Sequence, residues 1–173
     1  IDIIVNYSEC GDLEFIKDIF QDDVVFLKQE GKDLGEKMYN GLSFSLRNYH
    51  RSVLIGSDLP LMTGIDIEEA FNILETKDMV ISPTHDGGYY LIGMKEENKE
   101  VFNMKYSTSS VFQETIEKIK AMGKSYGVGN IQLDIDDKGD FLKLYRILKK
   151  DGNNCCPNTR DLVMKIMEKC DTN

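Results

Sequence analysis

The chain has 173 residues, of which 41% are hydrophobic and 29% are charged, and this composition suits a single folded domain with a hydrophobic core. Asp and Glu total 30 against 21 Lys and Arg, which gives a formal net charge of -9. So acidic a surface repels phosphate backbones and argues against a general nucleic-acid binder. The sequence also holds no apolar run near the roughly 20 residues that span a bilayer, so no membrane span is expected.

Four cysteines occur in the sequence, and none of them forms a Cys-x-x-Cys motif: Cys10, Cys155, Cys156 and Cys170. Neither of the two histidines has metal-ligand spacing to them. A zinc site is therefore not expected. We interpret the cysteines as reduced thiols of a cytoplasmic protein.

Short apolar runs alternate with amphipathic stretches along the whole chain. In chain order, the expected strands are IDIIV, DDVVFLK, SVLIGSDLP, DMVISP, GGYYLIGMK and IQLDID. Helical periodicity is expected over residues 13–20, 33–49, 67–75, 110–122, 141–150 and 159–170. This alternation predicts a single α/β domain, residues 1–173, with a mostly parallel sheet flanked by helices.

Local signals mark several of the helix ends. Thr63 with Asp66, and Ser110 with Gln113, have the spacing of capping boxes. Thr159 is the expected N-cap of the last helix. Gly123 and Gly152 are expected to end the two helices before it.

Acidic residues follow three of the expected strands at the edge where ligands bind in open α/β sheets. Asp58 follows VLIGS, Asp86 follows DMVIS and the turn PTH, and the acids Asp134 and Asp136 close the strand NIQLDID. Mg²⁺ is commonly held by one or two such carboxylates together with substrate phosphates. A metal site is one interpretation of Asp58, where Gly56 would permit close backbone approach, and a plain Asx-turn is the other.

The segment DGGYY places two glycines directly after Asp86. Consecutive glycines are typical of places where a ligand or another chain segment packs closely, although an ordinary turn before a strand explains them equally well. We interpret His85 as a turn residue rather than a general base. Of the later acids, Asp137 and Asp140 are expected to serve the first turn of the helix that follows.

The stretch SVLIGSDLPLMTGIDIEEAFNILETKDMVISPTHDGGYYLIGM resembles the signature region of a bacterial family of glycosyltransferase-like proteins, the radical-SAM/selenodomain-associated transferase type. That family belongs to the GT-A nucleotide-diphospho-sugar transferase superfamily. The resemblance extends to QEGKDLGEKM upstream and to YSTSSVFQET and LDIDDKGDFLKL downstream. The pairing of GSDLP with DGGYYLIG at this separation is its most specific part.

The resemblance implies a nucleotide-binding fold in which Asp58 helps to hold Mg²⁺ or Mn²⁺ on the phosphates, with Asp134 and Asp136 on the opposing side of the metal. It also implies that Asp86 lines the acceptor or sugar pocket, and our hypothesis is that this carboxylate is the base that takes the acceptor's proton. The remaining residues implied to contact or approach the nucleotide sugar or the acceptor are Gly35, Glu36, Gly56, Ser57, Gly87, Gly88, Tyr89 and Thr108. Gly35 and Glu36 would lie toward the nucleotide base.

Members of that family begin with a strand and a glycine-containing basic loop that cradles the phosphates, whereas this chain opens at what resembles their second strand. The expectation is therefore a domain that lacks its N-terminal strand and phosphate loop. A nucleotide-sugar transferase is the leading interpretation. The alternatives are a nucleotidyltransferase that acts on a phosphorylated acceptor, and a non-catalytic interaction module that forms a homodimer through an exposed edge.

Overall fold

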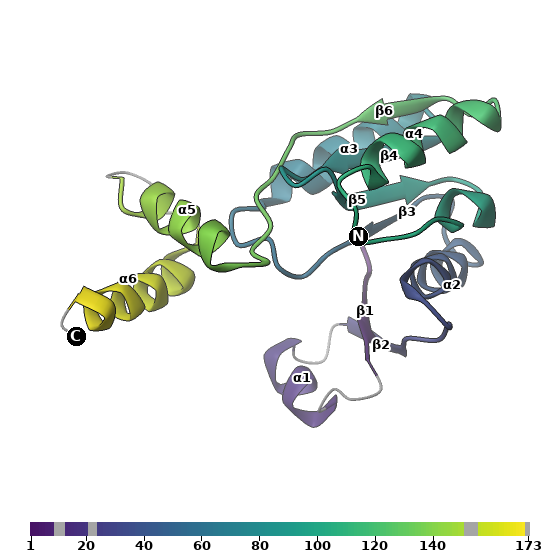
Figure 1. The fold of residues 1–173 in the computed structure, drawn as a ribbon. Helices are drawn as coiled ribbons and strands as arrows, with labels where there is room; N and C mark the ends of the chain where they lie inside the picture. The colour runs from purple at the N-terminus through teal and green to yellow at the C-terminus, as the bar shows by residue number, and fades with distance from the viewer. Residues whose placement is uncertain (9–12, 21–23, 151–155, 172–173) are drawn as a thin grey trace.

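The computed structural model describes residues 1–8, 13–20, 24–150 and 156–171 and shows an α/β fold, as predicted (Figure 1). Cys10, Gly152 and Cys155 lie outside the described residues, as does the side chain of Cys170. The elements follow in the order β1 (Ile3–Tyr7), α1 (Leu13–Phe20), β2 (Val24–Lys28), α2 (Leu34–Leu46), β3 (Ser52–Ile55), α3 (Gly64–Thr76), β4 (Met79–Pro83), β5 (Tyr89–Met94), the 3-10 helix η2 (Lys99–Phe102), α4 (Val111–Ala121), β6 (Tyr126–Val128), α5 (Lys138–Leu148) and α6 (Pro157–Asp171).

A four-stranded sheet with the order β3-β5-β4-β6 forms the centre of the molecule. β4 pairs in parallel with β6, whereas β5 is antiparallel to both β3 and β4. Three of the four strands therefore run in one direction, and β5 returns between two of them. No helix among the described residues is both long and apolar enough to cross a membrane.

This topology gathers three polar segments at one edge of the sheet. The turn after β3, the connection from β4 to β5 and the segment after β6 all leave the sheet on the same side. They carry Asp58, Asp86, and the acids Asp134 and Asp136, respectively. Strand order thus brings these acids to the same edge of the sheet.

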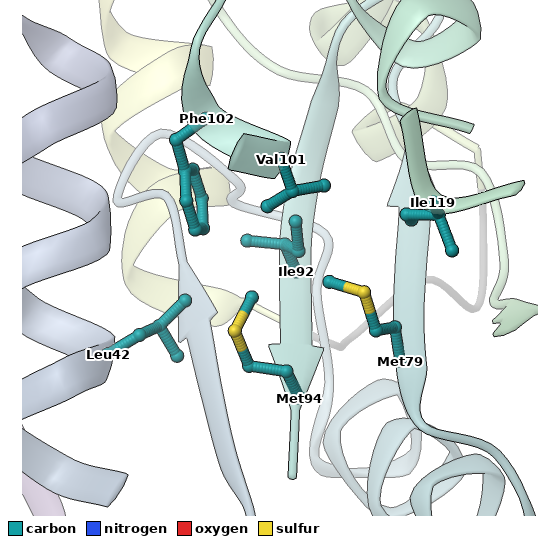
Figure 2. Close-up of a cluster of buried hydrophobic side chains, with 7 residues drawn as sticks. All are labelled: Leu42, Met79, Ile92, Met94, Val101, Phe102 and Ile119. Atoms are coloured by element: carbon teal, nitrogen blue, oxygen red, sulfur yellow. The ribbon is translucent and has the colours of Figure 1, made fainter. Parts of the chain in front are cut away.

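Helices cover both faces of the sheet, and the alternation of side chains along the strands fills two cores (Figure 1). Figure 2 shows the first core, in which Ile92 and Met94 of β5 lie with Met79 of β4, between Leu42 of α2 and Ile119 of α4. On the opposite face, buried residues of β4 and β5 pack against buried residues of α3; the strands contribute Val80, Tyr90 and Leu91, and the helix contributes Ala70 and Leu74.

Two smaller units flank the central sheet (Figure 1). β1 and β2 form a separate parallel pair, and α1 between them contributes no buried residue. At the other end, α5 and α6 lie side by side around a third cluster of Leu133, Leu144, Leu148 and Val163. Leu133 belongs to the segment that carries the acids, so this cluster supports the site from one side.

Three local predictions are wrong. IQLDID forms no strand, because only Gln132 makes a bridge, to Thr84, and the sixth strand is Tyr126–Val128 instead. Ser110 lies at the N-cap of α4 without a side-chain capping bond, since its hydroxyl contacts the Glu114 carboxylate. α6 begins at Pro157 rather than after Thr159, because proline suits the first helical turn.

Candidate functional site

Three carboxylates from two loops meet at the polar edge of the sheet. One carboxylate oxygen of each of Asp86, Asp134 and Asp136 lies within 4.8 Å of the other two. We call these three residues the acidic cluster. Asp134 is half-buried and the other two are exposed, so the cluster opens to solvent.

Asp86 is held in place by its own turn. Its Oδ1 accepts hydrogen bonds from Thr84 Oγ1 at 2.5 Å and from the backbone N–H of Gly88 at 2.9 Å. Thr84 continues β4 as a bridge residue, so the turn is anchored to the sheet. These bonds fix one carboxylate oxygen of Asp86.

Asp58, the metal ligand predicted from the sequence, lies beside the cluster and is not one of its three carboxylates. Its backbone carbonyl accepts a hydrogen bond from the N–H of Ile135 at 3.2 Å, which joins the β3 turn to the segment of Asp134 and Asp136. The negative charge of Asp58 helps to raise the pKa of Asp136. The side chain of Asp58 is exposed, so burial of its charge gives no reason for a cation at this residue.

Gly56, in the same turn, is not required by close packing. A Cβ at this position would come no nearer than 3.5 Å to another atom, namely Asp58 Oδ1. The predicted close backbone approach at Gly56 is therefore not made by the protein's own described atoms. Ser57 is exposed beside it.

Burial and neighbouring carboxylates raise the pKa of Asp134 and of Asp136. Partial burial and then the charges of Asp86, Asp136 and Asp140 raise the pKa of Asp134. Burial, followed by the charges of Asp58 and Asp86, raises the pKa of Asp136. Both shifts mean that the ionised cluster is electrostatically unfavourable by itself.

An oxygen-rich, negatively charged cluster of this kind fits a hard divalent cation. Mg²⁺ and Mn²⁺ prefer carboxylate oxygens, and a cation would offset the like charges that, together with burial, raise the pKa of Asp134 and of Asp136. Lys143, the nearby cation that forms an ion pair, lies 2.9 Å from Asp140 rather than on the cluster. The donor set therefore suits Mg²⁺ or Mn²⁺.

The later acids divide as predicted from the sequence. Asp137 is the N-cap of α5, and its side chain accepts a hydrogen bond from the N–H of Asp140 at 2.9 Å. Asp140 forms the ion pair with Lys143 in the first turn of the same helix. Asp137 and Asp140 therefore start α5 and leave Asp134 and Asp136 to the cluster.

The first of the two glycines after Asp86 accommodates another segment of the chain, whereas the atoms nearest to a Cβ at Gly88 would belong to Thr84 and Asp86 of the same turn. Gly87 has φ +94°, and a Cβ there would lie 2.1 Å from the carbonyl oxygen of Ser109. The N–H of Phe112 also donates to the carbonyl of Gly87 at 2.9 Å. The loop that contains Thr108 therefore packs directly on the turn of Asp86.

The other predicted binding residues have structural partners. A Cβ at Gly35 would lie 2.4 Å from the carbonyl oxygen of Phe102, so glycine allows α2 to begin against η2. Glu36 accepts a hydrogen bond from the N–H of Lys32 at 3.0 Å, which lowers the pKa of Glu36, and lies 3.6 Å from Lys99 Nζ. Burial raises the pKa of Tyr89, so its hydroxyl stays neutral.

A cavity of about 250 Å³ lies away from the acidic cluster, between α2 and the β1–β2 pair. Its lining includes Asn6, Lys28, Lys37 and Arg47. Neither the three cluster residues nor Asp58 line it. The chemistry suggested by the acids therefore belongs to the exposed edge of the sheet and not to this cavity.

Comparison with known proteins assigns the family. Residues 1–108 match the model of the family described as "Uncharacterized protein conserved in bacteria (DUF2064)". The chain belongs to this family. No curated protein matches the sequence of this DUF2064 member.

A solved structure supports the fold of the DUF2064 chain. It is the crystal structure of a "putative nucleotide-diphospho-sugar transferase" from Desulfovibrio desulfuricans G20. The two chains are 28% identical, with a TM-score of 0.80, and the match covers 95% of this chain and 75% of that one. The similarity supports the nucleotide-diphospho-sugar transferase superfamily that the sequence motifs indicate, and it does not distinguish among the families of that superfamily.

Sequence reasoning did not connect to the cluster of the DUF2064 chain three residues whose hydrogen bonds lie beside it: Thr84, Asp66 and Gln132. Thr84 orients Asp86, and Gln132 links Asp66 to the backbone beside Asp134. The capping-box spacing identified Asp66 only as a helix cap. No signal in the sequence pairs Gln132 with either of the other two, because their contacts join segments that are far apart in the chain.

Proposed function

We propose that the protein is a metal-dependent transferase that acts on a nucleotide-activated donor, with a nucleotide sugar as the donor class. The acidic cluster carries the proposal, because three carboxylates within 4.8 Å of one another form an oxygen donor set for a divalent cation. The similarity to the Desulfovibrio protein, and the resemblance of the GSDLP and DGGYYLIG motifs to the radical-SAM-associated transferase type, support the donor class.

In this proposal Asp86, Asp134 and Asp136 hold Mg²⁺ or Mn²⁺ and Asp58 stands beside them. When bound, the cation supplies positive charge to offset the negative charge that builds up on the departing diphosphate. The bonds from Thr84 and Gly88 to Asp86 keep one ligand oriented before substrate arrives. The bound cation would thereby attract phosphates at this site, although the net negative charge of the protein repels them.

This proposal exchanges the roles that the sequence gives to Asp58 and Asp86. The sequence assigns Asp58 to the metal and Asp86 to proton removal, but the carboxylate of Asp86 lies within the cluster. Asp58 is exposed on the adjacent turn, with its backbone tied to Ile135. We therefore assign Asp58 to orienting the acceptor and accepting its proton.

Two substitutions separate these roles. Asp86→Asn should weaken Mn²⁺ binding and donor binding together, because it removes a ligand charge. Asp58→Asn should keep Mn²⁺ bound and lower turnover, since general bases contribute about 10²–10⁴-fold to the rate. The opposite pattern, with Mn²⁺ lost only in Asp58→Asn, would restore the assignment made from the sequence.

The function itself is tested by isothermal titration of UDP-, GDP- and CDP-sugars into the protein with and without Mn²⁺. We expect one donor to bind in the presence of Mn²⁺ and its affinity to fall in Asp136→Asn. Asp161→Asn, at an exposed position on α6, is the matched control and should bind as the wild type does. Undiminished binding in Asp136→Asn would contradict the proposal, and pyrophosphate release from a nucleoside triphosphate would favour a nucleotidyltransferase instead.

A further inference from the structure

Gln132 connects three parts of the chain at the base of the acidic cluster. Its backbone N–H donates to the carbonyl of Pro83 at 3.1 Å, and the residue forms a parallel bridge with Thr84. Its side-chain Nε2 donates to Asp66 Oδ1 at 3.1 Å. Gln132 thus joins the end of β4, the start of α3 and the segment that carries Asp134.

Asp66 is a buried carboxylate that uses both oxygens. Its Oδ2 accepts hydrogen bonds from the N–H of Thr63 at 2.8 Å and from the Thr63 hydroxyl at 3.0 Å, which together complete the capping box of α3. Its Oδ1 is left for Gln132. The residue is only 7% exposed, and a carboxylate so buried must be well hydrogen-bonded to be tolerated.

The ionisation of Asp66 is consistent with this arrangement. Burial by itself would raise its pKa, but hydrogen bonds from the Thr63 backbone, Gln132, the Thr63 hydroxyl and Asn130 outweigh the burial and lower it. Asp66 therefore remains an acceptor at neutral pH. It holds Asn130 and Gln132, both in the segment that leads to Asp134.

The segment after β6 makes few backbone hydrogen bonds to the rest of the described protein. Between Gly129 and Asp136 its described backbone is tied to the rest of the protein by three hydrogen bonds, from Gly129 to Ile81, from Gln132 to Pro83 and from Ile135 to Asp58. Leu133 is buried between the second and third of them. A side-chain anchor at Gln132 therefore has a large share in fixing the direction in which Asp134 and Asp136 leave the sheet.

We propose that Asp66 and Gln132 are positioning residues that set the separation of the three carboxylates in the acidic cluster. The inference rests on the proposed function in one respect, that the cluster binds a divalent cation. Residues that orient metal ligands typically contribute about 10–100-fold to metal affinity. Removal of the Gln132 side-chain bond should therefore weaken Mn²⁺ binding by about tenfold or more.

A purely structural role for Asp66, as the cap of α3, makes a different prediction. Thr63→Ala removes the hydroxyl part of the capping box but leaves the bond between Asp66 and Gln132. It should lower the free energy of unfolding and leave Mn²⁺ affinity unchanged. Gln132→Met, which keeps the length of the side chain and removes its amide, should do the reverse.

Electron paramagnetic resonance of Mn²⁺, titrated into each full-length variant, provides the test. Gln132→Met should leave more free Mn²⁺ than the wild type at every protein concentration. The double variant Asp66→Asn with Gln132→Glu reverses donor and acceptor at unchanged total charge, and it should regain most of the affinity. Gln113→Met, which removes a Gln–Glu bond of the same kind on α4, should bind as the wild type does.

Two results would overturn the inference. One is equal Mn²⁺ affinity in Gln132→Met and the wild type, and the other is a loss in Thr63→Ala as large as that in Gln132→Met. If the wild type binds no Mn²⁺, the metal-dependent function fails, and amide hydrogen exchange then tests the positioning separately. Faster exchange at Ile135 in Gln132→Met supports the inference, whereas an unchanged rate rejects it.

Discussion

Gly87 shows why the turn after Asp86 needs glycine. Its φ of +94° is strained for any residue with a side chain, and the 2.1 Å approach to the Ser109 carbonyl leaves no room for a Cβ. Gly87→Ala should therefore lower the free energy of unfolding by about 2 kcal/mol or more, as measured by urea denaturation.

Gly64 provides the matched control for this substitution. It is the first residue of α3, and a Cβ there would meet no described atom within 4 Å. Gly64→Ala should be neutral, or stabilising by up to about 0.5 kcal/mol, because alanine favours helix. Equal destabilisation by the two substitutions would mean that the Ser109 contact does not constrain Gly87.

The ionised carboxylate of Asp134 should lower the stability of the folded protein when no cation is bound. Its pKa is raised above the ordinary 3.8 in the folded protein, so its stabilising contribution is complete below the unfolded-state pKa and is lost as pH rises through the folded-state pKa. In chelator at neutral pH, Asp134→Asn should therefore raise the melting temperature by on the order of 2 °C. Differential scanning fluorimetry between pH 4 and pH 7.5 measures this effect.

The gain from Asp134→Asn should shrink as the pH falls, because the wild-type carboxyl becomes protonated and neutral. Asp161→Asn, on the exposed side of α6, should show no such pH-dependent gain. A melting temperature of Asp134→Asn below that of the wild type at pH 7.5 in chelator would show that the ionised Asp134 carboxylate does not destabilise the folded protein.

At the scale of elements, the start of α5 depends on a single side chain. Asp137 accepts a hydrogen bond from the N–H of Asp140, whereas Ser110 holds the equivalent position on α4 without a capping bond. Asp137→Ala should cost about 1 kcal/mol of unfolding free energy, and Ser110→Ala less than about 0.5 kcal/mol. Urea denaturation of both variants provides the comparison, and equal costs would contradict it.

The strands and helices were predictable where apolar periodicity is strong, as in β4 and α3. β6 was missed because three residues, one of them Gly127, carry no alternation. Its place is set by packing instead, since a Cβ at Gly127 would lie 2.4 Å from Ile73 Cγ2 of α3. The LDID segment alternates as a strand does, yet beyond Gln132 its backbone bonds to the β3 turn through Ile135 rather than to a strand.

At the scale of the whole molecule, the convergence of acids was predictable because strand ends that point the same way gather at one edge. The sequence did not predict which of these acids form the cluster. Asp86 takes the place of Asp58 in the cluster because β4 pairs with β6, which places the Asp86 turn next to the segment after β6, whereas β5 lies between β4 and the strand that precedes Asp58. Periodicity does not reveal which strands are neighbours in a sheet.

A bound cation should stabilise the whole chain, because ligand that binds only the folded state raises the free energy of unfolding. At Mn²⁺ concentrations about 100 times the dissociation constant, the gain should be about 2.7 kcal/mol. Thermal melts with Mn²⁺, and again after excess chelator, measure this gain. An Mn²⁺-independent melting temperature would count against a site in the folded protein.

Calorimetric titration of Mn²⁺ into the nucleotide-free protein tests the acidic cluster most directly, when the wild type is compared with the double variant Asp134→Asn with Asp136→Asn. We predict saturable binding at one site in the wild type and none in the double variant. Absence of binding in the wild type, or the same binding curve in both proteins, would contradict a metal site formed by Asp86, Asp134 and Asp136.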